Sequence, residues 1–172
     1  MAEDRKSQAR ADDKTVAFGQ RLAGSEAFRT MFREGMALVE ETATYLDGDG
    51  RADSRLLTRA GSLAYATESM RLTTRLMQLA SWLLLQRAVN DGEMSAEQAQ
   101  LERGKVKLSG FATATEGPGW DDLPEHLRDL IARSIRLQDR IRRLDGVIDP
   151  SLETVENPVA SQIGRLTREF AK

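Results

Sequence analysis

The chain has 172 residues, contains no cysteine and carries a formal net charge of −2 at pH 7. This length suits one domain with a real core, and the absence of cysteine excludes disulfides and thiolate metal sites. The near-balanced charge lacks the basic excess that is typical of a dedicated nucleic-acid binder. The densest apolar run, residues 76–85, is too short for a membrane span of about 20 residues. We therefore expect a cytoplasmic protein with no nucleic-acid partner and no membrane insertion.

The N-terminal residues divide into an arm and a lead-in to the first helix. Residues 1–15 carry mixed charges and almost no large apolar side chain, so they lack the apolar region of a signal peptide. We expect residues 1–15 to form a disordered N-terminal arm. The predicted bundle domain covers residues 16–148, and it begins with a short apolar stretch of irregular or one-turn helical structure.

The first predicted helix begins after Ser25, a favoured N-cap residue. Apolar residues then recur mainly at spacings of three and four, which indicates an amphipathic helix. We expect this helix to end at Asp47-Gly48-Asp49-Gly50, where glycines can supply the left-handed conformations that terminate helices.

The second predicted helix is very long, because nothing breaks it between its cap at Asp53 or Ser54 and Asn90-Asp91-Gly92. It would measure about 54 Å at 1.5 Å per residue. One seam of this helix alternates spacings of four and three, a heptad pattern, and we expect the seam to lie in the core. The seam consists of Leu56, Ala60, Leu63, Thr67, Met70, Thr74, Met77, Ser81, Leu84 and Ala88.

The C-terminal part of the same helix is apolar on nearly every face. Such a helix must be covered on all sides, either by several helices of its own chain or by a second subunit. We therefore predict a homodimer. The residues assigned to the core or to the dimer contact are Leu76, Leu79, Trp82 and Leu83.

A third, shorter helix is predicted from Ser95, which forms a capping box with Gln98, to Val106 or Leu108. Residues 109–121 are rich in glycine and predict an irregular connection. The sequence as a whole contains no useful period-two strand pattern.

The fourth predicted helix opens with Asp122 and Glu125 in capping-box spacing and ends at Asp145-Gly146. Its apolar seam again has spacings of three and four. The seam consists of Leu127, Leu130, Ser134, Leu137, Ile141 and Leu144. The predicted fold class is an all-α, antiparallel helical bundle with one very long central helix and flexible N- and C-terminal tails.

The predicted flexible tail, residues 149–172, is punctuated by Pro150 and Pro158. Its last part carries an apolar stripe at helical spacing, although a helix this short is marginal in isolation. Two alternatives remain: the stripe packs on the bundle, or it binds a partner. The candidate partner-binding residues are Val159, Ile163, Leu166 and Phe170.

We predict no catalytic, cofactor-binding or metal-binding residues. The single histidine, His126, lies in a polar setting and is interpreted as a surface residue. One histidine cannot form a metal cluster or supply the paired Glu-x-x-His motifs of a di-iron bundle. The glycines after the first helix follow no strand, so they do not form a phosphate-binding loop.

Two alternative functions remain open. Glu68, Arg71 and Arg75 could line an anion-binding or catalytic pocket inside the bundle, although their spacing of three and four is equally typical of ion pairs on one helix face. The pocket hypothesis requires these side chains to converge in an enclosed cavity. A less favoured alternative is DNA binding through the basic patch of Arg140, Arg142 and Arg143.

Four segments of the chain carry a family resemblance: residues 32–48, residues 65–84, Gly92-Glu93-Met94-Ser95, and residues 137–145 with their Asp-Arg-Ile-Arg-Arg-Leu-Asp run. They resemble the alphaproteobacterial RcdA family, the regulator of CtrA degradation, over about residues 16–148.

The resemblance implies a non-enzymatic adaptor of the ClpXP protease, a small helical-bundle dimer with a mobile C-terminal tail. Its implied cargo is cell-cycle regulators such as the response regulator CtrA. The implied co-partners are a phosphorylation-controlled response-regulator adaptor and a cyclic-di-GMP-binding effector. The resemblance implies no cofactor, and it is compatible with recruitment to the cell pole.

Overall fold

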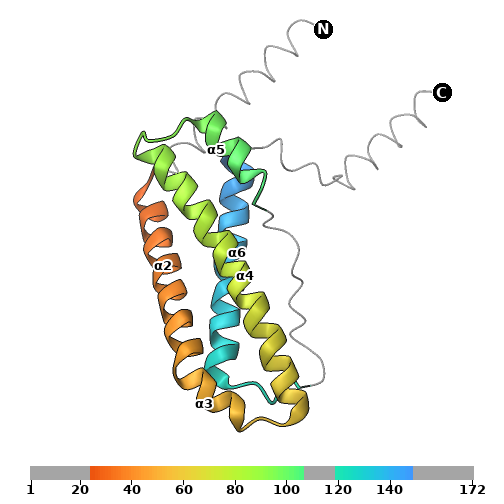
Figure 1. Ribbon diagram of the computed structural model, residues 1–172. Helices are drawn as coiled ribbons and strands as arrows, with labels where there is room; N and C mark the ends of the chain where they lie inside the picture. Colours follow the sequence, from red (N-terminus) through yellow and green to blue (C-terminus); the bar gives the residue numbers. More distant parts are fainter. Residues whose placement is uncertain (1–23, 107–118, 149–172) are drawn as a thin grey trace, which may run out of the picture.

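The computed structural model describes residues 24–106 and 119–148, and this part of the chain consists of five helices without a strand. Three long helices, α2 (Glu26–Asp47), α4 (Arg59–Asn90) and α6 (Glu125–Ile148), lie side by side (Figure 1). Two short helices, α3 (Asp49–Arg55) and α5 (Ala96–Arg103), lie at opposite ends of the bundle. The predicted all-α class is therefore confirmed. α2 runs opposite to α4 and α6, which run in the same direction.

α2 begins where the sequence predicts. The Ser25 side chain accepts a hydrogen bond from the Phe28 backbone N–H at 3.4 Å, which satisfies one of the free donors of the first turn. The helix ends at Asp47 as expected, but the predicted left-handed termination is wrong. Gly48 has φ −107°, and α3 begins at the next residue.

The predicted very long helix is present as α4, with 32 residues, but its predicted start at Asp53 or Ser54 is wrong. The chain leaves the helical conformation at residues 56–58, and Thr58 caps a new helix by accepting from the Gly61 N–H at 3.0 Å. The Thr58 hydroxyl also donates to Asp122 at 2.8 Å, which ties the start of α4 to the segment before α6. Gly119, at φ +83°, lies so close to this turn that a Cβ would approach the Ala60 carbonyl oxygen to 2.6 Å. The tight contact explains why glycine occupies this position.

The core is formed where the three long helices meet. The predicted seam of α6 is confirmed, because all six of its residues are buried. α4 contributes Leu72 and the four residues that the sequence assigned to the core or the dimer: Leu76, Leu79, Trp82 and Leu83. All of them pack within this single chain.

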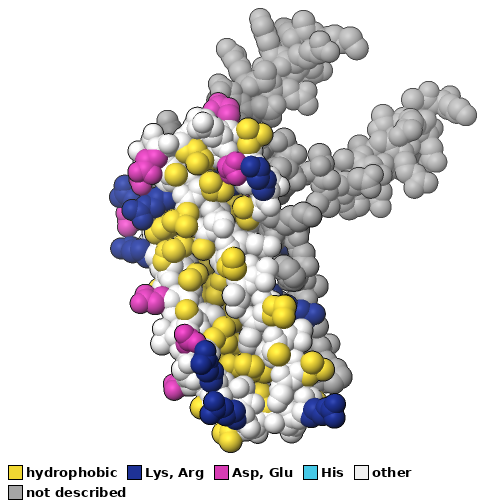
Figure 2. All heavy atoms as spheres, viewed as in Figure 1, with side chains coloured by type: hydrophobic (Ala, Val, Ile, Leu, Met, Phe, Trp, Pro, Cys, Tyr) yellow, Lys and Arg dark blue, Asp and Glu magenta, His cyan; other side chains and the backbone are white. Residues whose placement is uncertain are grey.

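The expectation that the heptad seam of α4 lies in the core is wrong. Its large side chains are instead strongly exposed: Leu56 86%, Leu63 71%, Met70 70%, Met77 66% and Leu84 52%. Figure 2 shows hydrophobic side chains running along this face of the molecule. α4 has two apolar faces, and the other described helices cover only one of them. Sequence periodicity indicates which face of a helix is apolar, but it does not indicate which helix or partner protein covers that face.

α5 and the C-terminal end of α6 are fastened to α4 by a buried polar cluster. The Trp82 indole N–H donates to Asp145 at 2.7 Å, and the Arg103 guanidinium lies 3.6 Å from the same carboxylate. Arg103 also donates to the Gln86 side chain at 3.3 Å. The predicted capping box of Ser95 and Gln98 is present at the start of α5, but the helix ends at Arg103, earlier than expected. α6 continues beyond the predicted end at Asp145-Gly146, to Ile148.

Candidate functional site

Within the described part of the chain, Glu68, Arg71 and Arg75, the residues of the alternative enzymatic function, contact neighbouring polar side chains directly. Arg71 donates directly to Glu68 at 2.7 Å, and Arg75 donates to the buried Ser134 hydroxyl at 3.0 Å. Burial lowers the pKa of the Arg75 guanidinium, and the nearby Glu68 carboxylate partly opposes this shift. The two cavities described below are lined by other residues. Glu68 and Arg75 are therefore buried polar side chains of the bundle, Arg71 lies partly exposed beside them, and the alternative function loses its structural basis.

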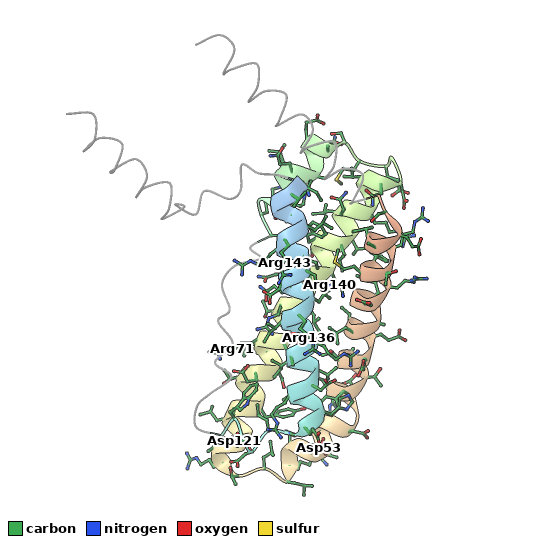
Figure 3. The ribbon with its side chains drawn as sticks, turned by 180° about the vertical axis from the view of Figure 1, so that it is seen from behind. Asp53, Arg71, Asp121, Arg136, Arg140 and Arg143 are labelled. Carbon is green, nitrogen blue, oxygen red and sulfur yellow. The ribbon has the colours of Figure 1, made fainter. Side chains whose placement is uncertain are left out.

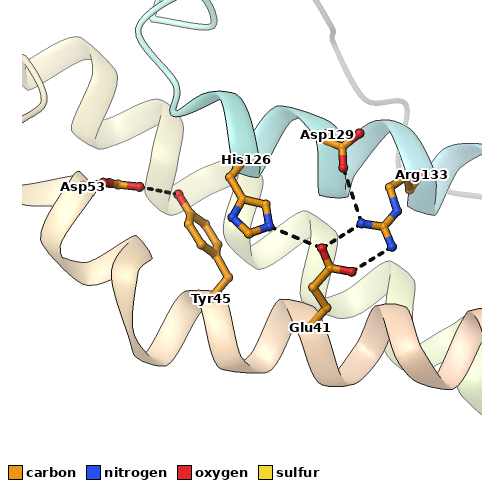
Figure 4. A network of polar contacts seen from close by, with 6 residues as sticks. All are labelled: Glu41, Tyr45, Asp53, His126, Asp129 and Arg133. Carbon is orange, nitrogen blue, oxygen red and sulfur yellow. Dashed lines mark hydrogen bonds and ion pairs between the residues drawn. The ribbon is translucent and has the colours of Figure 1, made fainter.

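A second polar cluster joins α2 to the start of α6 (Figure 4). Arg133 and Glu41 form a two-pronged ion pair with N–O distances of 2.7 and 2.8 Å, and His126 Nε2 lies 3.3 Å from the same carboxylate. The Arg133 hydrogen bond holds the pKa of Glu41 below its ordinary value, with a smaller contribution from His126, while burial opposes the shift. The His126 ring also packs on Tyr45 at 4.5 Å between centroids. His126 is exposed, as expected for a surface residue.

The Tyr45 ring links this cluster to α3. Its hydroxyl donates to Asp53 at 3.0 Å, and burial together with this carboxylate raises the pKa of Tyr45. A cavity of about 440 Å³ opens beside the cluster. It is lined by Ala37, Glu40, Glu41, Thr44, Tyr45, Gly48, Asp49 and His126. Because Arg133 already occupies the Glu41 carboxylate, we interpret the cluster as an ion-pair network that fixes the ends of three helices.

The part of the chain that the structure describes contains no group of three His, Cys, Asp or Glu side chains placed to hold a metal ion. None of its helices combines the length and the apolar character that crossing a membrane requires.

The exposed apolar face of α4 differs most from the sequence-based prediction, because we expected this face to lie in the core. We define the α4 stripe as the residues that follow its heptad spacing in the open part of the helix: Leu63, Thr67, Met70, Thr74, Met77, Ser81 and Leu84. The hydroxyls of Thr67, Thr74 and Ser81 donate to the backbone carbonyls four residues earlier, at 2.8–2.9 Å. Since these hydroxyls are satisfied within the helix, the stripe presents mainly methyl and methylene groups. An exposed apolar surface of this kind is typical of an interaction site.

The other predicted site residues have two different outcomes. Leu76, Leu79, Trp82 and Leu83 lie in the core, on the other side of α4 from the stripe. These four residues are therefore not available for contact with a second subunit. The tail residues Val159, Ile163, Leu166 and Phe170 lie outside the described part of the chain.

Comparison with known proteins now places the chain in a family. Residues 19–170 match the family described as "Protein of unknown function (DUF1465)", whereas no curated protein matches. Among solved structures, the chain is similar to the crystal structure of RcdA from Caulobacter crescentus CB15, with 54% sequence identity and a TM-score of 0.62. The match covers 75% of this chain and 96% of that chain. The chain therefore belongs to the RcdA family.

Proposed function

We propose that the protein is a non-enzymatic adaptor that binds cell-cycle regulatory proteins and helps deliver them to the ClpXP protease. The observation that carries this proposal is the 54% identity to RcdA across nearly the whole of that chain. The family resemblance of the sequence implies regulated degradation of CtrA-type response regulators. The paired state of Glu68, Arg71 and Arg75 supports a binding role over a catalytic one.

The physical basis of such an adaptor is tethering. One weak contact with the protease complex and one weak contact with the cargo raise the local concentration of cargo at the unfoldase without any covalent step. The proposed partners are ClpXP with its response-regulator co-adaptor, a cyclic-di-GMP-binding effector, and cargo such as CtrA. We also propose that the tail residues Val159, Ile163, Leu166 and Phe170 contribute one of these contacts, because their spacing forms an apolar stripe after a proline-marked linker.

We further propose that the protein is a homodimer and that the α4 stripes of two copies pack against each other. Leu63, Met70, Met77 and Leu84 recur every seven residues, as in the contact line of a coiled coil. Thr67, Thr74 and Ser81 alternate with them, and such small side chains allow two helices to approach closely. Burying the large side chains of both stripes contributes on the order of 10 kcal/mol before the cost of association is subtracted.

The adaptor function is tested by the lifetime of its cargo in cells. In the organism that encodes the chain, deletion of the gene should lengthen the half-life of a CtrA-type regulator in a pulse-chase measurement. Re-expression of the wild-type chain should restore that half-life. A ClpXP substrate that needs no adaptor serves as the control and should be unaffected. Unchanged half-lives for every cell-cycle regulator followed would reject the proposal.

A further inference from the structure

A groove of about 300 Å³ runs between α2 and α6, next to the ion-pair network but distinct from the cavity beside Tyr45. Its floor is apolar and includes the buried side chains Leu38 and Leu137, whereas its rim is dominated by the arginines of α6. The full lining is Glu34, Ala37, Leu38, Arg133, Arg136, Leu137 and Arg140.

The rim is strongly basic in a chain that is acidic overall. Between residues 133 and 143, α6 carries five arginines and one aspartate, although the whole chain has a net charge of −2. Figure 3 shows Arg136 and Arg140 on the same part of α6, beside α2. Spacings of three and four place the three groove arginines about one helical turn apart along one face.

The three rim arginines differ in whether their charge is already paired. Arg133 is held by Glu41, and Arg140 forms an ion pair with Glu34. Arg136 lies between them, is exposed, and has no hydrogen-bond or ion-pair partner among residues 24–106 and 119–148. Its guanidinium is therefore the available cation of the groove. Arginine recognises carboxylates through two parallel hydrogen bonds.

We propose that this groove binds an acidic segment of a partner protein. An Asp or Glu carboxylate of the segment docks on Arg136, and a neighbouring apolar side chain enters the groove over Ala37 and Leu137. This inference deepens the proposed function, and it rests on that function for the view that the partner belongs to the degradation machinery or its cargo. The contact itself depends only on the geometry and charge of the groove.

A protein partner fits the groove better than a nucleic acid does. Glu34 and Glu41 neutralise Arg140 and Arg133, so the groove offers a charge for one carboxylate rather than a row of cations for a phosphate backbone. The apolar floor can accept an aliphatic side chain, for which a phosphate backbone has no counterpart. Nucleic-acid binders also neutralise several phosphates at once, whereas Arg136 is the one groove arginine without an ion-pair partner among the described residues.

The test measures peptide binding to the full chain by fluorescence anisotropy at low ionic strength. The probes are a short fluorescein-labelled peptide of Glu, Ala and Leu, the same peptide with Gln in place of Glu, and a short single-stranded DNA. The Glu peptide should bind more tightly than the Gln peptide and the DNA. Arg136→Gln should weaken its binding about tenfold, as expected for loss of one charge-assisted contact.

Arg142→Gln is the matched control, because Arg142 is an exposed arginine of the same helix that does not line the groove. This variant should bind the Glu peptide as the wild type does. In a methyl-labelled sample, resonances of Ala37, Leu38 and Leu137 should shift when the peptide is added. Equal weakening by both substitutions would overturn the proposal. So would equal binding of the two peptides, tighter binding of DNA, or peptide-induced shifts confined to other methyl groups.

The groove and the adaptor function can fail separately. If the wild-type chain shortens cargo half-life in cells but does not bind the Glu peptide, the groove proposal is rejected and the adaptor function stands. If the peptide binds through Arg136 but no cargo half-life depends on the chain, the adaptor function is rejected and the groove stands.

Discussion

Substitution of Met77 by glutamine tests whether the α4 stripe holds two copies together. Met77 lies in the middle of the stripe and is 66% exposed in the single chain. Burying this exposed part in a dimer contributes about 1–2 kcal/mol in each copy. A single substitution counts twice in a symmetric pair, so the dimer should be weakened by about 2–4 kcal/mol, or roughly 30- to 700-fold in Kd. The fold of each chain should be unaffected, because Met77 contributes little to the core.

Sedimentation equilibrium over a range of concentrations measures this change directly. Wild type should be dimeric at micromolar concentration, and Met77→Gln should shift toward monomer. Leu101→Gln is the matched control, because Leu101 is an equally exposed apolar side chain that lies on α5 and outside the stripe. Circular dichroism should show the same helix content for all three proteins. A monomeric wild type, or equal dissociation constants for wild type and Met77→Gln, would refute the reasoning.

Three further predictions concern stability and the tail. Asp145→Ala removes the acceptor of the buried Trp82 N–H, so urea denaturation should show a loss of about 2–3 kcal/mol, and a loss near zero would contradict the role of this cluster. Arg133 lowers the pKa of Glu41, so ionised Glu41 stabilises the fold above the ordinary pKa of 4.5, and this contribution is lost as pH falls through the lower folded pKa. In Arg133→Gln, NMR titration should show a higher Glu41 pKa and stability should fall less over that acidic range; an unchanged pKa would contradict this. Deletion of residues 150–172 should leave the melting temperature almost unchanged and weaken partner binding, whereas a large loss of stability would place the tail in the core.

The apolar seams of α6 and α4 show what sequence periodicity can and cannot predict. The seam of α6, which includes Leu127 and Ile141, lies opposite a polar helix face. Only one face of α6 could therefore be buried, and the prediction was correct. In α4, apolar residues occupy two faces, and the buried face that runs through Leu72, Leu79 and Trp82 has the same spacing of three and four as the exposed heptad. The small polar residues of the exposed heptad, Thr67, Thr74 and Ser81, could have indicated that this face is not the core, because such side chains fill space poorly in a core.

The remaining differences arise from contacts between segments that are distant in sequence. Thr58 interrupts the predicted long helix, and its hydroxyl bonds with Asp122, more than sixty residues away. Arg136 was not singled out from sequence, because a row of arginines does not reveal which of them already have acidic partners. Glu34 forms an ion pair with Arg140, and Glu41 forms one with Arg133. Both pairs depend on the packing of α2 against α6, which the sequence pattern does not predict.

The adaptor function is tested most directly by reconstituted degradation. Purified ClpXP, its response-regulator co-adaptor, the cyclic-di-GMP-bound effector and a CtrA-type cargo are combined with and without this chain, and the rate of cargo loss is followed over a range of cargo concentrations. We predict a lower KM for the cargo with little change in the maximal rate, because tethering raises the local cargo concentration without altering unfolding or cleavage. Equal rates with and without the chain, at every cargo concentration and for each cell-cycle regulator tested, would contradict the adaptor function.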